Sequence, residues 1–282
     1  MIFYFTGTGN SLYVAHKIAD GLNDEILSMS DCLNNTSLSF TIAENERIGF
    51  VFPTYFRGMP TIVLDFLKKF YFQNYNNHYV YAVCSGGGIS GNTLHSFGRK
   101  FVRYGVTLHA AFEVTMPSNF VLFADMLKSE EDITEVLENA DFEIKNIIRD
   151  ISENKHICPK SDLRKWAISF VSYPFYKYDR STKPFHVSKT CTGCCLCAKH
   201  CPCRVITMQD KRPVWIKDKC TECFRCLHHC PAQAIQYGKK TKTRGRYVNP
   251  RIKSYKTKNH KQEIYKDDQL VDSLVKVNTD SQ

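Results

Sequence analysis

Long apolar segments are missing from this sequence of 282 residues. Its most apolar stretch, residues 166–175, is about half as long as the roughly 20 residues that a helix needs to span a bilayer, and Pro174 interrupts it. No basic segment followed by an apolar run precedes the threonine- and glycine-rich loop that begins at Thr6, as a secretion signal would require. We therefore expect no membrane association and a cytoplasmic location.

Motifs that would identify a substrate are missing as well. The sequence contains no Cys/His/Asp arrangement for nucleophilic catalysis, no paired-carboxylate motif and no second nucleotide fingerprint. Its composition, with 43% hydrophobic and 23% charged residues, is that of a globular chain with room for one large or two modest domains. The sequence therefore names no substrate.

Cysteine is the residue that the sequence has in excess. Ten of its 13 cysteines fall between residues 191 and 230, which indicates metal binding in a reducing compartment rather than the scattered disulfides of a secreted protein. Eight of the ten form two copies of the pattern C-x-x-C-x-x-C-x-x-x-C-P, which is typical of proteins with two 4Fe-4S clusters. The first copy consists of Cys191, Cys194, Cys197 and Cys201, and the second of Cys220, Cys223, Cys226 and Cys230.

The fourth cysteine of each copy is expected to serve the cluster of the other copy. Cluster one would then use Cys191, Cys194, Cys197 and Cys230, and cluster two would use Cys220, Cys223, Cys226 and Cys201. Structural zinc sites are the alternative, but zinc bound by four cysteines needs two separated pairs per site. We expect neither Cys195 nor Cys203 to be a ligand.

Short β-rich runs alternate with helical patterns through the first 150 residues, which predicts βαβ units and a doubly wound parallel sheet of five strands. The strands are expected at residues 2–5, 25–29, 47–52, 79–84 and 106–114, and the helices at 12–22, 62–70, 93–104 and 133–151. In such a sheet the ligand binds at the carboxyl ends of the strands, where the strand order reverses.

The loop after the first strand has the composition of a phosphate site. It reads Thr6, Gly7, Thr8, Gly9, Asn10 and Ser11, so that hydroxyl and amide groups join the backbone N–H groups at a helix start without adding positive charge. This set suits a monophosphate dianion. The loop lacks the lysine of a P-loop and the third glycine of G-x-G-x-x-G, which argues against a nucleoside triphosphate or a dinucleotide. An ordinary glycine-rich turn with a helix N-cap is the alternative.

Two further loops leave the same predicted edge of the sheet. One contains Pro53, Thr54, Tyr55, Phe56, Arg57 and Gly58, and it offers aromatic faces to a planar ring. The other contains Ser85, Gly86, Gly87 and Gly88, whose backbone can approach a ligand closely. Taken singly, Tyr55 and Phe56 fit a position in the hydrophobic core as well as one that faces a cofactor. Three such loops at the same edge of the sheet are stronger evidence for a cofactor site than any one of them.

With its T-G-T-G-N-S loop, the first part of the chain resembles flavodoxins that bind FMN. Residues 1–238 resemble a family of bacterial and archaeal fusions of a flavodoxin-like domain to a two-cluster ferredoxin. The resemblance implies a flavodoxin-like α/β domain followed by a small α+β ferredoxin domain. It also implies FMN, with its phosphate at residues 6–11 and its ring between the loops at Pro53 and Ser85. The third loop lacks the aromatic residue that often stacks on the flavin, which would leave one flavin face open.

We divide the chain into an FMN-binding domain at 1–154, an aromatic-rich connector at 155–188, a ferredoxin domain at 189–238 and a basic tail at 239–282. Much of the tail is expected to be flexible. The net charge is −6 in residues 1–150, +9 in residues 151–238 and +7 in residues 239–282. Cluster-bound thiolates would offset part of the positive charge of the middle region.

A flavin exchanges one or two electrons and a cluster exchanges one, so we expect an electron-transfer protein that works with a redox partner. A flavin-dependent reductase of a small molecule or a nicotinamide is the alternative. The basic tail, with Tyr247, Tyr255 and Tyr265, also fits contact with nucleic acid, but a solvated tail or a dock for an acidic redox partner explains it equally well. An electron carrier is therefore favoured over a stand-alone enzyme.

Overall fold

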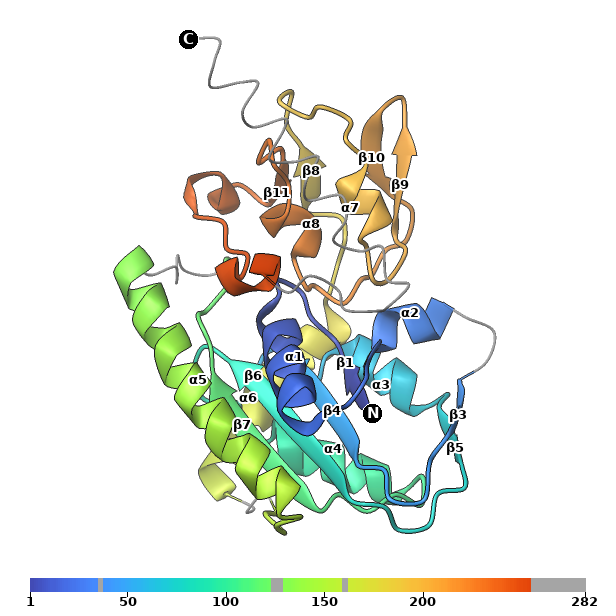
Figure 1. The fold of residues 1–282 in the computed structure, drawn as a ribbon. Coiled ribbons are helices and arrows are strands. Elements are labelled where there is room, and N and C mark those ends of the chain that lie inside the picture. The colour runs from blue at the N-terminus through green and yellow to red at the C-terminus, as the bar shows by residue number, and fades with distance from the viewer. Residues whose placement is uncertain (35–37, 123–128, 159–161, 255–282) are drawn as a thin grey trace.

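A five-stranded parallel sheet is the centre of the N-terminal domain in the computed structural model, which describes residues 1–34, 38–122, 129–158 and 162–254 (Figure 1). Its strands are β1 (Ile2–Tyr4), β2 (Ile26–Ser28), β4 (Ile48–Pro53), β6 (Val80–Gly86) and β7 (Ala110–Thr115), in the order β2-β1-β4-β6-β7. When these five strands are numbered 1 to 5 in chain order, their order in the sheet is 2-1-3-4-5, which is the order of the flavodoxin-like fold. The predicted fold class of this domain is confirmed.

Helices cover both faces of the sheet (Figure 1). One face carries α1 (Asn10–Leu22) and α5 (Glu130–Ser152), and the other carries α3 (Thr61–Leu67), α4 (Thr93–Val102) and the short α2 (Met29–Asn34). The central strands are therefore buried on both sides, which is why β4 and β6 are continuous apolar runs rather than alternating ones.

The core on the α3 and α4 face is built mainly from phenylalanine. Phe50 of β4 meets Phe101 edge to face, with ring centroids 4.7 Å apart, and Phe97 lies 4.5 Å from Phe101 in a stacked arrangement. A parallel pair of short strands, β3 (Ser39–Thr41) and β5 (Tyr71–Gln73), adds further aromatic side chains to this core. Phe97 and Phe101 are fully buried, so the close packing of the core on this face depends on the volume of their side chains.

The segment that the sequence indicated only as a connector contains a helix, α6 (Leu163–Tyr178). Asp162 caps its first turn, because its Oδ1 accepts hydrogen bonds from the backbone N–H groups of Arg164 and Lys165 at 2.8 and 3.4 Å. Pro174 lies inside the helix near its end, where a missing N–H removes one backbone hydrogen bond without ending the helix. The prolines had hidden this helix from the sequence pattern.

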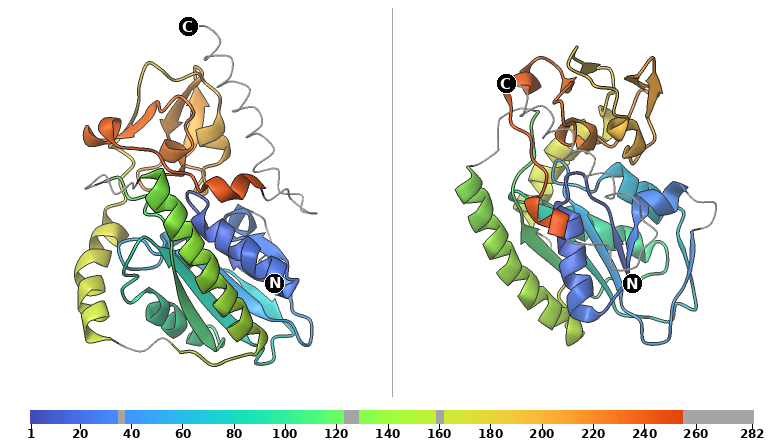
Figure 2. Two further views of the ribbon diagram at one scale, coloured as in Figure 1. Left: turned by 60° about the vertical axis from the view of Figure 1, so that its left-hand side comes forward. Right: turned by 45° about the horizontal axis from the view of Figure 1, so that its top comes forward.

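The ferredoxin domain lies over the carboxyl ends of the large sheet (Figures 1 and 2). It contains two antiparallel strand pairs, β8 (Phe185–Val187) with β11 (Ile235–Tyr237) and β9 (Ile206–Gln209) with β10 (Arg212–Trp215). Two single-turn helices, α7 (Leu196–Lys199) and α8 (Arg225–His228), occupy equivalent places in the two cysteine patterns. This is the small α+β domain that the sequence predicted.

The first part of the basic tail folds back onto the flavodoxin-like domain (Figure 2). It forms two 3-10 turns, η1 (Lys240–Thr243) and η2 (Pro250–Ser254). Ile252 is buried against the core beside α1, and Arg251 forms an ion pair with Asp141 of α5. Residues 255–282 lie outside the described residues, so the expected flexibility of that part stays a prediction.

No helix in the described ranges is both long and apolar enough to cross a membrane.

Replacing Phe97 by alanine tests the aromatic core. The change leaves a large cavity, so the free energy of unfolding measured by urea denaturation should fall by about 3–5 kcal/mol. Phe142 on α5 is 69% exposed, and its alanine variant should stay within about 0.5 kcal/mol of the parent. Equal losses in the two variants would contradict the packing described here.

Candidate functional site

A cavity of about 1080 Å³ lies between the carboxyl edge of the sheet and the ferredoxin domain. Of the 16 residues predicted to bind FMN, all except Gly9 and Gly58 line it. Gly9 instead forms the N-cap of α1 with a φ of 98°, a conformation that favours glycine. The structure thus brings the three predicted loops together around one space.

Two hydroxyl groups of the phosphate loop, those of Thr6 and Thr8, already accept hydrogen bonds within the protein. Thr6 Oγ1 accepts from a backbone N–H at 3.0 Å, and Thr8 Oγ1 accepts from Asn119 Nδ2 at 2.6 Å. Ser11 and Ser85 share one hydrogen bond of 2.7 Å between their hydroxyls. Because a hydroxyl that accepts keeps its own proton to donate, this neutral set fits the phosphate group of FMN.

Asn10 joins two other segments to the phosphate loop, and the donor that its amide would add for phosphate stays a prediction, because an amide has two N–H groups and the hydrogen bond to Pro117 uses one. Asn10 Nδ2 donates to the carbonyl of Pro117 at 2.9 Å, while its Oδ1 accepts from the Tyr247 hydroxyl at 2.7 Å and from Asn249 Nδ2 at 3.1 Å. The side chain therefore ties the start of α1 to the loop after β7 and to the folded part of the tail.

The second loop contains a strained turn at residues 55–58. Its ends exchange backbone hydrogen bonds of 2.9 and 3.0 Å, and both central residues, Phe56 and Arg57, have positive φ values of 49° and 60°. Bulky residues adopt this conformation at a cost of about 1–3 kcal/mol each. Helix α6 holds the turn, because Ser169 Oγ donates to the Arg57 carbonyl at 2.8 Å. Ser172 Oγ shares its one proton between the Phe56 carbonyl at 3.0 Å and the Ile168 carbonyl of its own helix at 2.8 Å.

Aromatic side chains from several elements form the walls of the cavity. Phe56 stacks on Tyr176 of α6 with centroids 5.8 Å apart, and Phe120 approaches Phe56 edge to face at 5.4 Å. Tyr55 Oη is buried and has no hydrogen-bond partner among the described residues. A buried hydroxyl of this kind fits a ligand with polar ring atoms, so the fit of the cavity to FMN extends from the phosphate loop to its aromatic end.

The ferredoxin domain touches the phosphate loop directly. A Cβ atom added to Gly7 would lie 2.7 Å from the carbonyl oxygen of Cys223 and 3.0 Å from Tyr55 Oη. Only glycine leaves room for this approach of two backbones. Cys223 and its neighbours Glu222 and Phe224 line the same cavity as the predicted flavin loops.

Five cysteines line a second, smaller cavity in the ferredoxin domain. Four of them, Cys191, Cys194, Cys197 and Cys230, are the set predicted for cluster one, and the fifth is Cys195, whose Sγ donates to the Gly193 carbonyl at 3.2 Å. Burial raises the pKa of Cys197 to about 12, and the nearby Cys194, Cys230 and Cys191 add to the rise. The fourth cysteine of the second pattern has therefore joined the first three of the first pattern.

The set predicted for cluster two is also gathered in one place. Burial raises the pKa of Cys226, and Cys223, Cys201 and Cys220 raise it further, with a smaller effect from Cys197 of the other set. Cys203 lies close to the same set, since Cys223 and Cys201 follow burial among the causes that raise its pKa to about 12. Iron would have to displace the protons of these thiols.

No three His, Cys, Asp or Glu side chains in the described ranges converge closely enough to hold a single metal ion. A 4Fe-4S cluster needs a wider arrangement than a single ion, because its four cysteines surround the whole cluster and each binds a different iron. The chemistry of the two donor sets, four thiols each, fits such clusters.

Several residues around the large cavity were not predicted. They come from the loop after β7 (Pro117, Ser118, Asn119 and Phe120), from α6 (Tyr176 among them) and from the ferredoxin domain. The loop after β7 leaves the same edge as the other three loops, so the rule that located those loops applies to it too. Nothing in the sequence pattern pointed to α6 or to the docking of the second domain.

Comparison with known families agrees with the cysteine pattern. Residues 183–231 match the family described as a 4Fe-4S dicluster domain, and this range includes both copies of the pattern. The chain therefore combines an iron–sulfur domain with a domain of flavodoxin-like fold, as the resemblance implied. No curated protein matches the chain.

Three solved structures are similar to the N-terminal half. They are a putative flavoprotein from Bacteroides uniformis (13% identity, 49% of this chain and 96% of that chain, TM-score 0.33), a flavodoxin from Streptococcus pneumonia TIGR4 (22%, 52% and 97%, 0.30) and an FMN-dependent NADH-azoreductase from Bacillus anthracis (12%, 54% and 98%, 0.37). The assignment of the fold rests on the strand order and not on these matches.

Replacing Gly7 by alanine should separate the phosphate loop from the Cys223 segment, because the new methyl group meets a backbone oxygen. The dissociation constant for FMN, measured by quenching of flavin fluorescence, should rise at least about tenfold. Gly98 in α4 does not line the cavity, and an added Cβ there meets only the Leu108 side chain, at 3.3 Å, so its alanine variant should bind FMN as the parent does. Unchanged binding by Gly7→Ala would show that the close approach is not needed.

Proposed function

We propose that this protein is an iron–sulfur flavoprotein that relays electrons between two 4Fe-4S clusters and FMN. One observation carries the proposal: the cavity formed by the predicted flavin loops is also lined by Cys223 of the cluster-two set. The two cofactor sites would therefore be neighbours, although the residues that form them lie far apart in the sequence.

The FMN phosphate would be held by Thr6, Thr8, Ser11 and the backbone of Gly7, and the flavin ring would lie among Tyr55, Phe56 and the glycines 86–88. FMN supplies the change between one-electron and two-electron chemistry. The task of the chain is to bind and orient the ring and to keep the turn at residues 55–58 in its strained form through α6.

The two cysteine sets would play unequal parts in the relay. Cys223 of the cluster-two set contacts the phosphate loop, which supports cluster two as the neighbour of the flavin. Cys194 of the cluster-one set is exposed, whereas all four cysteines of the cluster-two set are half-buried. Cluster one is therefore the site that we assign to exchange with a redox partner.

The partner that we propose is an acidic electron carrier in the cytoplasm. Residues 151–238 have a net charge of +9 before any cluster is bound, which favours encounter with a negatively charged surface. All 13 cysteines are free, which fits a reducing compartment.

The assignment of two clusters, with Cys201 as a ligand of one of them, is tested by a pair of serine variants. After anaerobic purification the parent should contain about eight iron atoms and one FMN per chain. Cys201→Ser removes a ligand of cluster two and should leave about four irons, held by the cluster-one set. Cys203→Ser serves as the matched control, because this neighbouring cysteine is no predicted ligand, and it should keep the full iron content. Zinc without sulfide in the parent would overturn the iron–sulfur assignment.

The relay is tested by anaerobic stopped-flow reduction with a chemically reduced acidic ferredoxin. Flavin reduction should be at least about tenfold slower in Cys201→Ser than in the parent or in Cys203→Ser, because cluster two is the proposed neighbour of the flavin. Equal rates in all three proteins would contradict the relay. Steady turnover of NADH or of a small organic acceptor by the purified protein alone would instead favour the reductase alternative.

A further inference from the structure

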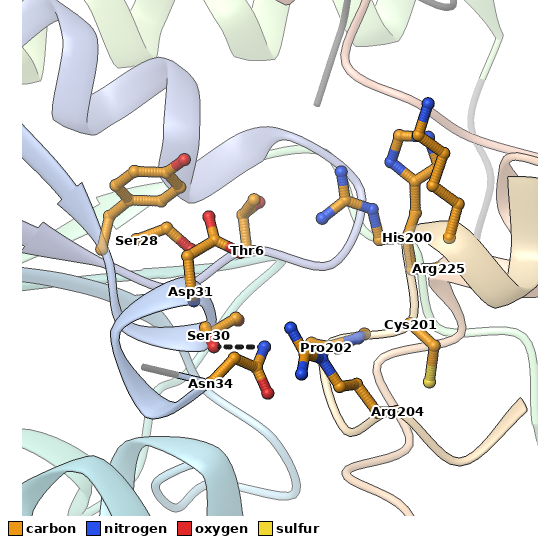
Figure 3. Close-up of a pocket in the computed structure, with 12 residues that line it drawn as sticks. Thr6, Ser28, Ser30, Asp31, Asn34, His200, Cys201, Pro202, Arg204 and Arg225 are labelled. Atoms are coloured by element: carbon orange, nitrogen blue, oxygen red, sulfur yellow. Dashed lines mark hydrogen bonds between the residues drawn. The ribbon is translucent and has the colours of Figure 1, made fainter. Parts of the chain in front are cut away.

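A smaller pocket of about 100 Å³ lies between the two domains and shares Thr6 with the large cavity (Figure 3). The flavodoxin-like domain contributes Ser28, Ser30 and Asp31 from the end of β2 and from α2. The ferredoxin domain contributes Lys199, His200, Cys201, Pro202 and Arg204 from the end of the first cysteine pattern and Arg225 from the middle of the second. Neither domain could form this pocket alone.

Basic side chains dominate the ferredoxin side of the pocket. Lys199, His200, Arg204 and Arg225 line it, and Arg225 is only 8% exposed. The guanidinium groups of Arg204 and Arg225 point toward the side that carries Asp31 (Figure 3). Among the residues that line the pocket, Lys199, Arg204 and Arg225 are positively charged and Asp31 is the one carboxylate, and this lining favours an oxyanion that can accept charge-assisted hydrogen bonds.

Asp31 decides which oxyanion fits. Its backbone N–H donates to Ser28 Oγ at 3.3 Å, and its Oδ2 is buried without a hydrogen-bond partner among the described residues. A carboxylate repels an oxyanion without protons, but it accepts a hydrogen bond from one that carries a proton. At neutral pH inorganic phosphate keeps at least one proton, sulfate has none, and a phosphate monoester has largely lost its last one, since its second pKa is about 6.

We propose that this pocket binds one inorganic phosphate ion. Arg204, Arg225 and Lys199 hold its charged oxygens, and Asp31 accepts the hydrogen bond of its remaining hydroxyl. Because both domains supply ligands, bound phosphate stabilises their docked arrangement. The site is separate from the loop proposed for the FMN phosphate, although the two share Thr6.

The test is isothermal titration of the cluster-loaded, FMN-saturated protein with inorganic phosphate. One ion per chain should bind, and Arg204→Gln should weaken binding by about tenfold or more, because it removes a charged donor from the pocket. Lys217 is an exposed lysine of the same domain outside the pocket, and Lys217→Gln should bind phosphate as the parent does. No binding by the parent, or equal binding by Arg204→Gln, would overturn the proposal. Arg204 lines this pocket and not the large cavity, so a loss of phosphate binding in Arg204→Gln reports on this pocket alone. The result stays valid whether or not the protein binds FMN.

Discrimination between anions is the second measurement. The parent should prefer phosphate to sulfate and to glycerol 3-phosphate, and Asp31→Asn should lose at least about tenfold of the preference over sulfate, because an amide can donate to an oxyanion without protons. A parent without preference, or a preference that survives in Asp31→Asn, would refute the role given to Asp31. The visible spectrum and the thermal midpoint of each variant verify that it has folded and holds its clusters.

Discussion

The contact between Gly7 and Cys223 is the constraint on which the arrangement of the site depends. A methyl group at Gly7 would come within 2.7 Å of the Cys223 carbonyl, so the two domains can approach this closely only through a residue without a side chain. The same contact brings a cysteine of the ferredoxin domain to the edge of a cavity that the flavodoxin-like domain opens. Residues of both domains therefore line one cavity.

Two segments that join the domains keep this contact in place. Tyr176 of α6 accepts from the Thr61 backbone N–H and donates to the Thr221 carbonyl, both at 3.0 Å, and it thereby links α3 to the second cysteine pattern. The folded part of the tail makes a second link, because the Tyr247 hydroxyl donates to Asn10 Oδ1 at the start of α1, at 2.7 Å. The buried His228 ties this segment back to the ferredoxin domain, because its Nδ1 accepts from the Tyr247 N–H at 3.2 Å.

Much of the site was predictable because the relevant signals are local. Periodicity located the five strands of the main sheet, and the rule that ligands bind at the carboxyl ends of parallel strands located the three loops. The loop after β7 follows the same rule and was missed only because no glycine or hydroxyl motif marks it. Helix α6 was missed for another reason: Pro174 is a strong local signal against helix, and long-range hydrogen bonds to Phe56 and Arg57 outweigh it.

The sequence by itself determined the class of the fold, the two cysteine patterns and the phosphate-type loop, because each depends on residue identity at short and regular spacing. Only the tertiary structure decided that Asn10 anchors the tail, that α6 holds a strained turn, and that the flavin loops and Cys223 share one cavity. These features join residues more than 100 positions apart, and their distances are set by packing between surfaces that no local pattern encodes.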